Sequence, residues 1–189
     1  MNEIKVAENK TLKLTNVVSR RIAPEELGNM MVALTQLQNF IKSHNAQPIG
    51  PLVQAIKIGP APEHAPELYL MQQATQLITQ TEPGYEVDAV LRVKNCLYAH
   101  YTGPMAYSQL ASSKLQILAF EKDLKLTGDN YTIFVNQDDD DAVIDVFMET
   151  NVTMTTTIQN LDDLQDRRIM MDRDVPPYGY AFVILVACS

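Results

Sequence analysis

The sequence predicts an α+β protein built from two copies of one strand–helix–strand–strand unit, related by a pseudo-twofold axis. Helix and strand patterns alternate along the chain, which favours a mixed fold over a bundle or a sandwich. Landmarks of the two copies also recur at nearly constant spacing: Pro104 follows Pro24 by 80 residues, and Gly128 follows Gly50 by 78. We expect an antiparallel sheet with helices on one face and a groove on the other. A groove between repeats is a common place for a small-molecule site.

The first copy is expected over about residues 14–72. An extended segment, Thr15–Ala23, leads into a helix over residues 24–44, whose apolar residues follow the spacing of one helix face. Two short strands are then predicted at Leu52–Ile58 and Glu67–Met71, joined by a loop rich in proline.

The second copy, about residues 94–149, repeats this order. Its extended segment is Asn95–Thr102, and its helix runs from Pro104 to about Leu126. A hairpin follows, with strands at Tyr131–Asn136 and Ala142–Met148. The hairpin tip carries four consecutive aspartates, which lack the alternating ligands and central glycine of a calcium loop, so we expect a solvated turn.

The rest of the chain is expected to join or extend these copies within a single domain of residues 1–189. Residues 73–93 form a linker with an additional strand at Thr75–Thr81, and residues 150–189 form a C-terminal extension. In that extension, Gln159–Arg167 predicts a short polar helix or loop, and Tyr180–Ala187 predicts a buried strand. Two uses of this last strand stay open: it completes the sheet, or it docks a second copy in a homodimer.

Composition excludes several classes of function. The 189 residues carry a formal net charge of −8, so a phosphate backbone would be repelled, and we expect no direct nucleic-acid binding. The longest apolar run, Ala181–Cys188, is too short to cross a bilayer, and the N-terminus lacks an apolar signal core. Two cysteines and three histidines show no disulfide framework or metal-ligand spacing. We therefore expect a cytoplasmic protein with no cofactor, no metal and no membrane partner.

Alternation along the strands sorts their side chains into two faces. Asp145 and Phe147 are expected to point away from the helices, toward the groove. Glu67 and Tyr69 are expected to do the same at matching positions of the first copy, Glu67 being 78 residues before Asp145. A carboxylate beside aromatic rings suits a lipophilic cation, through charge pairing and cation–π attraction. If partly desolvated, the same carboxylate also suits a general base. Alternation by itself gives any half-exposed strand this acid–x–aromatic pattern, so the structural interpretation stays open as well.

Three local motifs support one resemblance. His100, Gly103 and Pro104 end an extended run and open a long helix, Gly50 and Pro51 precede a strand, and Asp145-Val146-Phe147 lies in the last hairpin strand. On these residues, over about residues 14–149, the chain resembles the GyrI-like effector-binding superfamily. That group includes gyrase-inhibitor-like proteins and the ligand-binding domains of some AraC- and MerR-type regulators.

The resemblance implies that Asp145 stands where the superfamily has a ligand-contacting glutamate, and Phe147 where it has a tyrosine. The chain departs from the pattern in the shorter aspartate and in Glu149, which replaces a proline after the strand. No helix-turn-helix pattern precedes the first strand, so a stand-alone member of the superfamily is expected.

The leading functional prediction is a protein that binds an aromatic or lipophilic cationic small molecule in the groove. The predicted ligand-binding residues are Asp145, Phe147, Glu67, Tyr69, Tyr98 and His100. The alternative is a hydrolase of strained, cyclopropane-bearing toxins, as some stand-alone relatives are, in which Asp145 activates water beside Tyr98 or Tyr69. A third class, a gyrase-type inhibitor that binds a protein, is supported by the acidic hairpin tip and the net charge alone.

Overall fold

The computed structural model describes residues 3–58 and 65–151, which belong to one compact unit. Its elements are β1 (Glu3–Ile22), the 3₁₀ helix η1 (Pro24–Asn29), α1 (Met30–Ser43), β2 (Pro48–Lys57), β3 (Glu67–Ala74), β4 (Tyr85–Gly103), the 3₁₀ helix η2 (Met105–Tyr107), α2 (Gln109–Glu121), β5 (Lys125–Asn136) and β6 (Ala142–Asn151). The elements predicted at Gln159–Arg167 and Tyr180–Ala187 lie outside the described residues.

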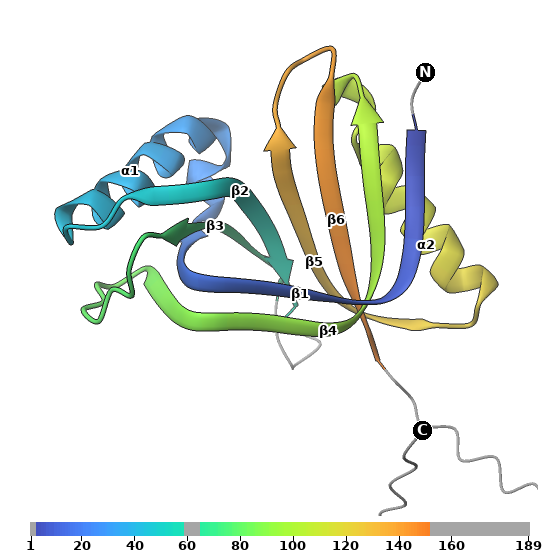
Figure 1. Cartoon of the computed structure of the whole chain (residues 1–189), viewed down its shortest axis with the longest axis horizontal. Coiled ribbons are helices and arrows are strands. Elements are labelled where there is room, and N and C mark those ends of the chain that lie inside the picture. Colours follow the sequence, from blue (N-terminus) through green and yellow to red (C-terminus); the bar gives the residue numbers. More distant parts are fainter. Residues whose placement is uncertain (1–2, 59–64, 152–189) are drawn as a thin grey trace, which may run out of the picture. The chain divides into compact units, whose positions relative to one another are not determined.

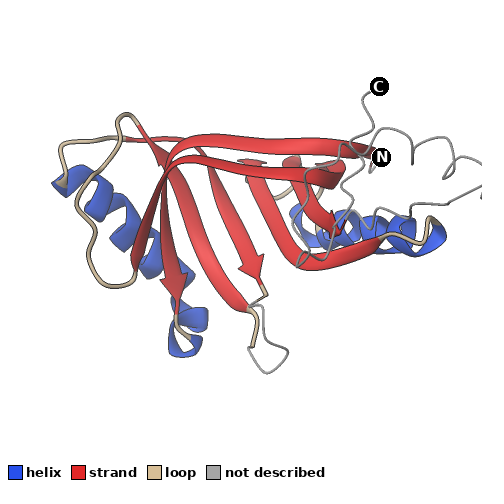
Figure 2. Cartoon of the chain, turned by 90° about the horizontal axis from the view of Figure 1, so that it is seen from below, coloured by secondary structure: helices blue, strands red, loops and turns tan. Residues whose placement is uncertain are grey.

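The six strands close into one antiparallel ring in the order β1-β3-β2-β5-β6-β4. The long strands β1 and β4 pair with each other along nearly their whole length and bend together (Figure 1). The later part of β1 also pairs with β3, and the later part of β4 also pairs with β6. The two halves of this ring therefore share β1 and β4, and a helix covers each half from outside (Figure 2).

The backbone confirms the duplicated, pseudo-twofold α+β architecture that the sequence predicts. Left-handed backbone conformations recur at equivalent places, because each unit must bend its strands and end its helix in the same way. The related pairs are Asn16 and Asn95 (φ 50° and 55°, 95 minus 16 being 79), Asn45 and Asp123 (φ 57° and 52°, 78 apart), and Gly50 and Gly128 (φ 68° and 100°, 78 apart).

Each helix buries one stripe against its own half of the sheet. On α1, the buried positions Ala33, Leu37, Phe40 and Ile41 follow helical spacing and pack on residues such as Leu70 of β3.

The second half is built in the same way with smaller residues. On α2, Ala111, Leu115 and Ala119 pack on Leu97 of β4 and Ile144 of β6. The two alanines flank Leu115 at intervals of one turn, so they let the helix approach the strands closely.

A third cluster lies on the opposite face of the strands, away from both helices. It contains Leu12, Val17, Val53, Ala55, Tyr69, Met71, Val93, Cys96, Tyr131 and Ile133. We call this set the inner cluster, because it forms the lining of the strand ring between the two halves.

One predicted element is wrong. Thr75–Thr81 forms no strand but a bend and an irregular segment, in which Thr75 N–H donates to the Gln47 carbonyl at 3.0 Å. The physical reason is that β3 already pairs with β1 on one side and β2 on the other, so no further strand can pair with β3. Ile78 instead buries its side chain in the core under α1.

Other elements differ in length. β1 begins at Glu3 and β4 at Tyr85, so β4 starts within the segment expected to be a linker. The second helix ends at Glu121, and β5 already begins at Lys125. Within the described residues, no helix is long and apolar enough to span a membrane.

Replacing Gly128 with alanine should destabilise the fold strongly. A Cβ at this position would lie 2.3 Å from Cδ1 and 3.0 Å from Cγ1 of Ile58, on a backbone with φ of +100° that L side chains rarely adopt. We expect Gly128→Ala to lower the free energy of unfolding by about 2–4 kcal/mol in urea titration.

Gly28→Ala is the matched control, because an added Cβ there meets nothing within 4 Å. It should change the free energy of unfolding by less than about 1 kcal/mol. Equal effects of the two substitutions would contradict the close approach of Gly128 to Ile58.

Candidate functional site

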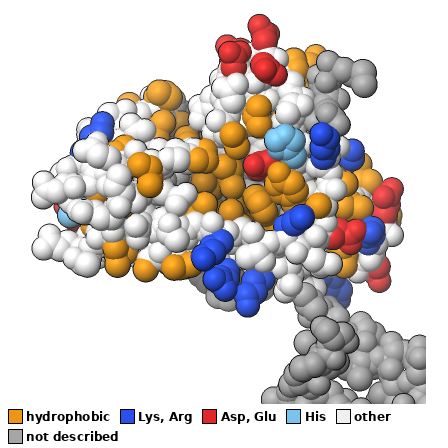
Figure 3. All heavy atoms as spheres, in the orientation of Figure 1, with side chains coloured by type: hydrophobic (Ala, Val, Ile, Leu, Met, Phe, Trp, Pro, Cys, Tyr) orange, Lys and Arg blue, Asp and Glu red, His pale blue; other side chains and the backbone are white. Residues whose placement is uncertain are grey.

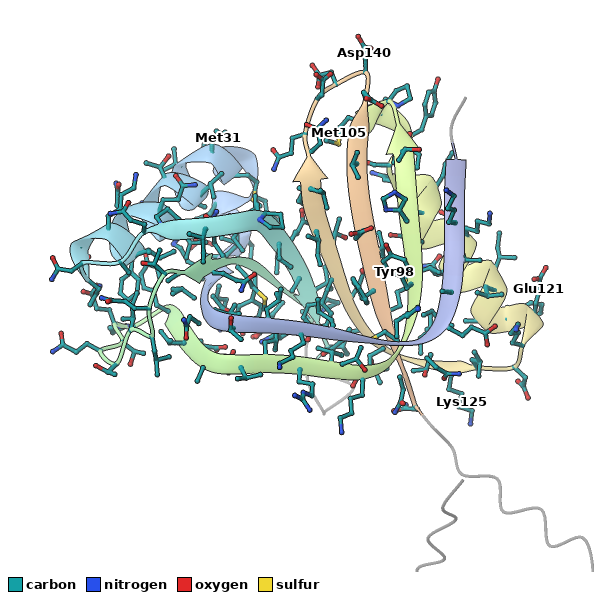
Figure 4. The ribbon with its side chains drawn as sticks, in the orientation of Figure 1. Met31, Tyr98, Met105, Glu121, Lys125 and Asp140 are labelled. Atoms are coloured by element: carbon teal, nitrogen blue, oxygen red, sulfur yellow. The ribbon has the colours of Figure 1, made fainter. Side chains whose placement is uncertain are left out.

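Four of the predicted site residues form one wall of the inner face, and we call them the Asp145 wall. Tyr98 and His100 lie on β4, where they pair with Phe147 and Asp145 of β6, respectively. Their strand neighbours pack on α2, so alternation turns these four side chains to the other face, where Phe147 packs against the inner cluster. Figure 4 marks Tyr98 on this face of β4.

The carboxylate of Asp145 is held by two donors. Its Oδ1 accepts a hydrogen bond from the Tyr98 hydroxyl at 2.8 Å and lies 2.8 Å from Nδ1 of His100. Because an ionised carboxylate only accepts, the second contact requires a proton on His100 Nδ1. The two contacts fix the direction of the carboxylate, and the Asp145 side chain is 23% exposed, so part of it remains in contact with solvent.

Aromatic rings stand beside this carboxylate. The rings of Tyr98 and Phe147 lie 4.9 Å apart between centroids, at 48° to each other. Burial, followed by the hydrogen bond to Asp145 and the charge of that carboxylate, raises the pKa of Tyr98 to about 12. Tyr98 therefore keeps its proton at neutral pH and remains a hydrogen-bond donor.

The first half carries a wall with different chemistry, which we call the Glu67 wall. Arg21 Nη2 lies 2.6 Å from Glu67 Oε1, and the Tyr69 hydroxyl donates to Glu67 Oε2 at 2.8 Å. Nζ of Lys57 stands 4.6 Å from the centroid of the Tyr69 ring. Burial and the bond to Glu67 raise the pKa of Tyr69 to about 12. On this wall, Arg21 already pairs with the carboxylate of Glu67, and Lys57 already lies over the ring of Tyr69.

The strand register corrects the predicted equivalence of Glu67 and Asp145. Arg21 and His100 are 79 residues apart (100 minus 21), the same offset as Asn16 and Asn95. Arg21 pairs with Tyr69, whereas His100 pairs with Asp145. The structural counterpart of Asp145 is therefore Tyr69, because β3 and β6 differ by two residues in their registers. The repeated acid–x–aromatic pattern does not occupy matching positions.

The surface between the walls is apolar. Figure 3 shows hydrophobic side chains gathered in a hollow between the half with β2 and β3 and the half with β5 and β6, beside a histidine and an acidic side chain. Tyr131 and Cys96 of the inner cluster are buried, and burial raises the pKa of both groups. A buried thiol with a raised pKa is a poor nucleophile, so Cys96 acts as a small apolar residue.

Sequence reasoning missed Arg21 and Lys57. Strand alternation places both residues on the inner face, and this could be predicted from the sequence. Their partners, Glu67 and Tyr69, follow only from the pairing of β3 with β1 and β2. In the described part of the chain, no group of three or more His, Cys, Asp or Glu side chains could hold a metal ion.

No protein-family model and no curated protein matches the sequence. Among solved structures, the chain is similar to EcmrR in a complex with DNA, at 12% identity and a TM-score of 0.54 over 79% of this chain and 57% of that one. It is also similar to a hydrolase encoded by lin2189 from Listeria innocua, at 10% identity and a TM-score of 0.51 over 79% and 92% of the two chains.

A weaker similarity, with 7% identity and a TM-score of 0.47 over 79% and 94% of the two chains, is to SAV2435 bound to tetraphenylphosphonium. Because EcmrR and the hydrolase are only 12% and 10% identical to this chain, these similarities show the fold alone. The duplicated α+β fold of this chain is thus one that occurs in a DNA-bound protein and in a hydrolase.

Removing the charge of Asp145 should lower the pKa of Tyr98. In ¹³C NMR of labelled tyrosine, we expect Tyr98 to titrate near pH 12 in the native protein. In Asp145→Asn the pKa should fall but stay above the ordinary value of about 10, because burial is the larger cause and remains.

The raised pKa of Tyr98 also stabilises the folded state at neutral pH. The folded state holds the Tyr98 proton more tightly than the unfolded chain, so this contribution is complete below pH about 10 and is lost as the pH rises toward 12. Glu67→Gln is the control, since it should move Tyr69 and leave Tyr98 unchanged. An unaltered Tyr98 titration in Asp145→Asn would show that the two side chains are not hydrogen-bonded.

Proposed function

We propose that this protein binds a small lipophilic cation on the Asp145 wall. The observation that carries the proposal is a carboxylate held by a phenol and an imidazole, neither of them a permanent cation, next to two aromatic rings. Among ion pairs within the described residues, Asp145 pairs with His100 alone, so its charge is available to a ligand. A cation over the rings of Tyr98 or Phe147 would gain both charge pairing and cation–π attraction.

The opposite wall is poorly suited to the same ligand. An incoming cation would have to displace the Arg21 guanidinium from Glu67 and the Lys57 ammonium from the face of Tyr69. We therefore assign Glu67 and Tyr69, which the sequence analysis placed on the ligand, to the second wall of the groove rather than to charge recognition.

The resemblance to the GyrI-like superfamily supports this proposal, because it implies that Asp145 stands where that group has a ligand-contacting glutamate. The apolar hollow between the walls supplies the surface that a lipophilic ligand needs, since its hydrocarbon parts leave water on binding (Figure 3).

A hydrolase is the second candidate, favoured by the hydrogen bond between Tyr98 and Asp145 and by the fold similarity to the Listeria innocua hydrolase. In this alternative, Asp145 orients or activates a water molecule while an aromatic neighbour holds the electrophile. A strained cyclopropane-bearing compound would be the substrate class. The two candidates use the same wall and differ in whether the bound molecule leaves unchanged.

Titration with tetraphenylphosphonium tests the binding proposal, because this cation is permanent and carries four aromatic rings. We expect saturable binding in calorimetry, weakened at least tenfold in Asp145→Asn, which corresponds to about 1.4 kcal/mol. Phe147→Leu should weaken binding as well, because it removes the ring while keeping an apolar side chain.

Glu67→Gln is the matched control and should change the affinity less than about threefold, since its charge is already paired with Arg21. Binding that is unaffected by Asp145→Asn, or lost equally in Glu67→Gln, would refute the assignment of the cation to the Asp145 wall. Turnover of a cyclopropane-bearing substrate that is abolished in Asp145→Asn would establish the hydrolase instead.

A further inference from the structure

A second cavity lies on the helix side of the strands, where α1 meets β2, β3 and β5. Its volume is about 200 Å³. Six apolar side chains line it: Met30, Met31, Leu34, Leu52, Leu70 and Phe134. Gln54 of β2 and Gln137 of the β5–β6 connection complete the lining with amide groups. We call this space the α1 cavity.

The α1 cavity is separate from the groove. On β2, Leu52 and Gln54 alternate with Val53, which belongs to the inner cluster. On β5, Phe134 follows Ile133, which belongs to the inner cluster as well. Successive strand residues point to opposite faces, so the cavity and the Asp145 wall lie on different sides of the sheet.

The α1 cavity has a buried floor and a rim that is open to solvent. Leu70 is 2% exposed and forms part of the buried floor, whereas Met31 is 73% exposed and stands at the rim. A molecule that entered would cover the exposed part of Met31, which gives binding a hydrophobic driving force. The unbranched side chains of Met30 and Met31 can adjust to the shape of a ligand.

The lining defines the chemistry of the occupant. None of its eight side chains is charged, so an ion would lose its hydration without gaining a partner. The amides of Gln54 and Gln137 make no hydrogen bond within the described part of the chain and remain available to one polar group. A dry apolar cavity of about 150 Å³ holds a benzene ring, so this larger space suits two fused rings.

We propose that the α1 cavity is a second ligand site, which takes a neutral, fused bicyclic aromatic molecule with one hydrogen-bonding substituent. This inference does not depend on the Asp145 wall. It gives the protein two sites of different ligand chemistry, one for a lipophilic cation in the groove and one for a neutral ring compound under α1.

Titration with 1-naphthol tests the proposal. The protein has no tryptophan, so the fluorescence of the probe can be followed without a background from indole. We expect saturable one-to-one binding, and a loss of affinity of at least tenfold in Met31→Lys, which puts a charge at the rim. Because Met31 is largely exposed, this variant should keep the wild-type melting temperature.

Ile117→Lys is the matched control: Ile117 is an apolar residue of α2 that is 58% exposed, and this variant should bind 1-naphthol as the wild type does. Asp145→Asn and saturating tetraphenylphosphonium should also leave naphthol binding unchanged, which separates this result from a failure of the proposed function. A readout that needs no variant is ¹³C-methyl NMR, in which Met30 and Met31 should shift and Met71 of the inner cluster should not.

Three results would overturn the inference: no saturation up to the solubility limit of 1-naphthol, displacement of the probe by tetraphenylphosphonium, or shifts confined to Met71. Wild-type affinity in Met31→Lys would place the probe elsewhere and overturn it as well.

Discussion

The ladder between β1 and β4 is the constraint on which the rest of this structure depends. It runs from the pair Glu3–Thr102 to the pair Arg20–Tyr85, with register shifts between Ala7 and Leu12 where the two strands bend. Because each long strand enters both halves, neither half has a complete sheet without the other. The later part of β1 pairs with both β4 and β3, and the later part of β4 pairs with both β1 and β6, so these two strands join the halves into one sheet.

The ladders that β4 and β1 form on their other sides, with β6 and β3, set the chemistry of the two walls. β4 places Tyr98 and His100 beside β6, and their contacts set the direction of the Asp145 carboxylate. Such preorganisation reduces the loss of side-chain freedom on binding. The equivalent part of β1 carries Arg21, a permanent cation, to Tyr69 and Glu67. One duplicated backbone thus pairs the acid with a histidine and a phenol on one wall, and with an arginine and a phenol on the other.

Much of this could be predicted from local sequence patterns. The buried face of α1 follows from its apolar spacing, and the outward and inward faces of β6 follow from the alternation of Ile144, Asp145, Val146 and Phe147. What local patterns could not give was strand length and register. The polar segment of β1 from Glu8 to Lys13 shows no strand alternation. It is extended because β4 pairs with much of it. The two-residue difference in register between β3 and β6 leaves no trace in the spacing of landmarks.

Contacts between segments far apart in the sequence could not be predicted either, because they depend on the strand pairing. Lys57 and Tyr69 meet because β2 and β3 pair, and the α1 cavity exists because Phe134 of β5 reaches residues of α1. Such features depend on which strands are neighbours in the sheet, and neither amino-acid composition nor hydrophobic periodicity determines the strand order. The backbone turns that mark the duplication were visible as glycines, while Asn16 and Asn95 adopt the same left-handed conformation without a glycine.

A crystal structure of the protein with tetraphenylphosphonium tests the central claim most directly, because it locates the cation relative to both walls. We expect the phosphonium to lie on the inner face, within about 6 Å of the Tyr98 or Phe147 ring centroid, with the Asp145 carboxylate directed at it and its hydrogen bond to Tyr98 kept. A cation seated on Tyr69 in place of Lys57, or bound away from the inner face, would contradict the central claim.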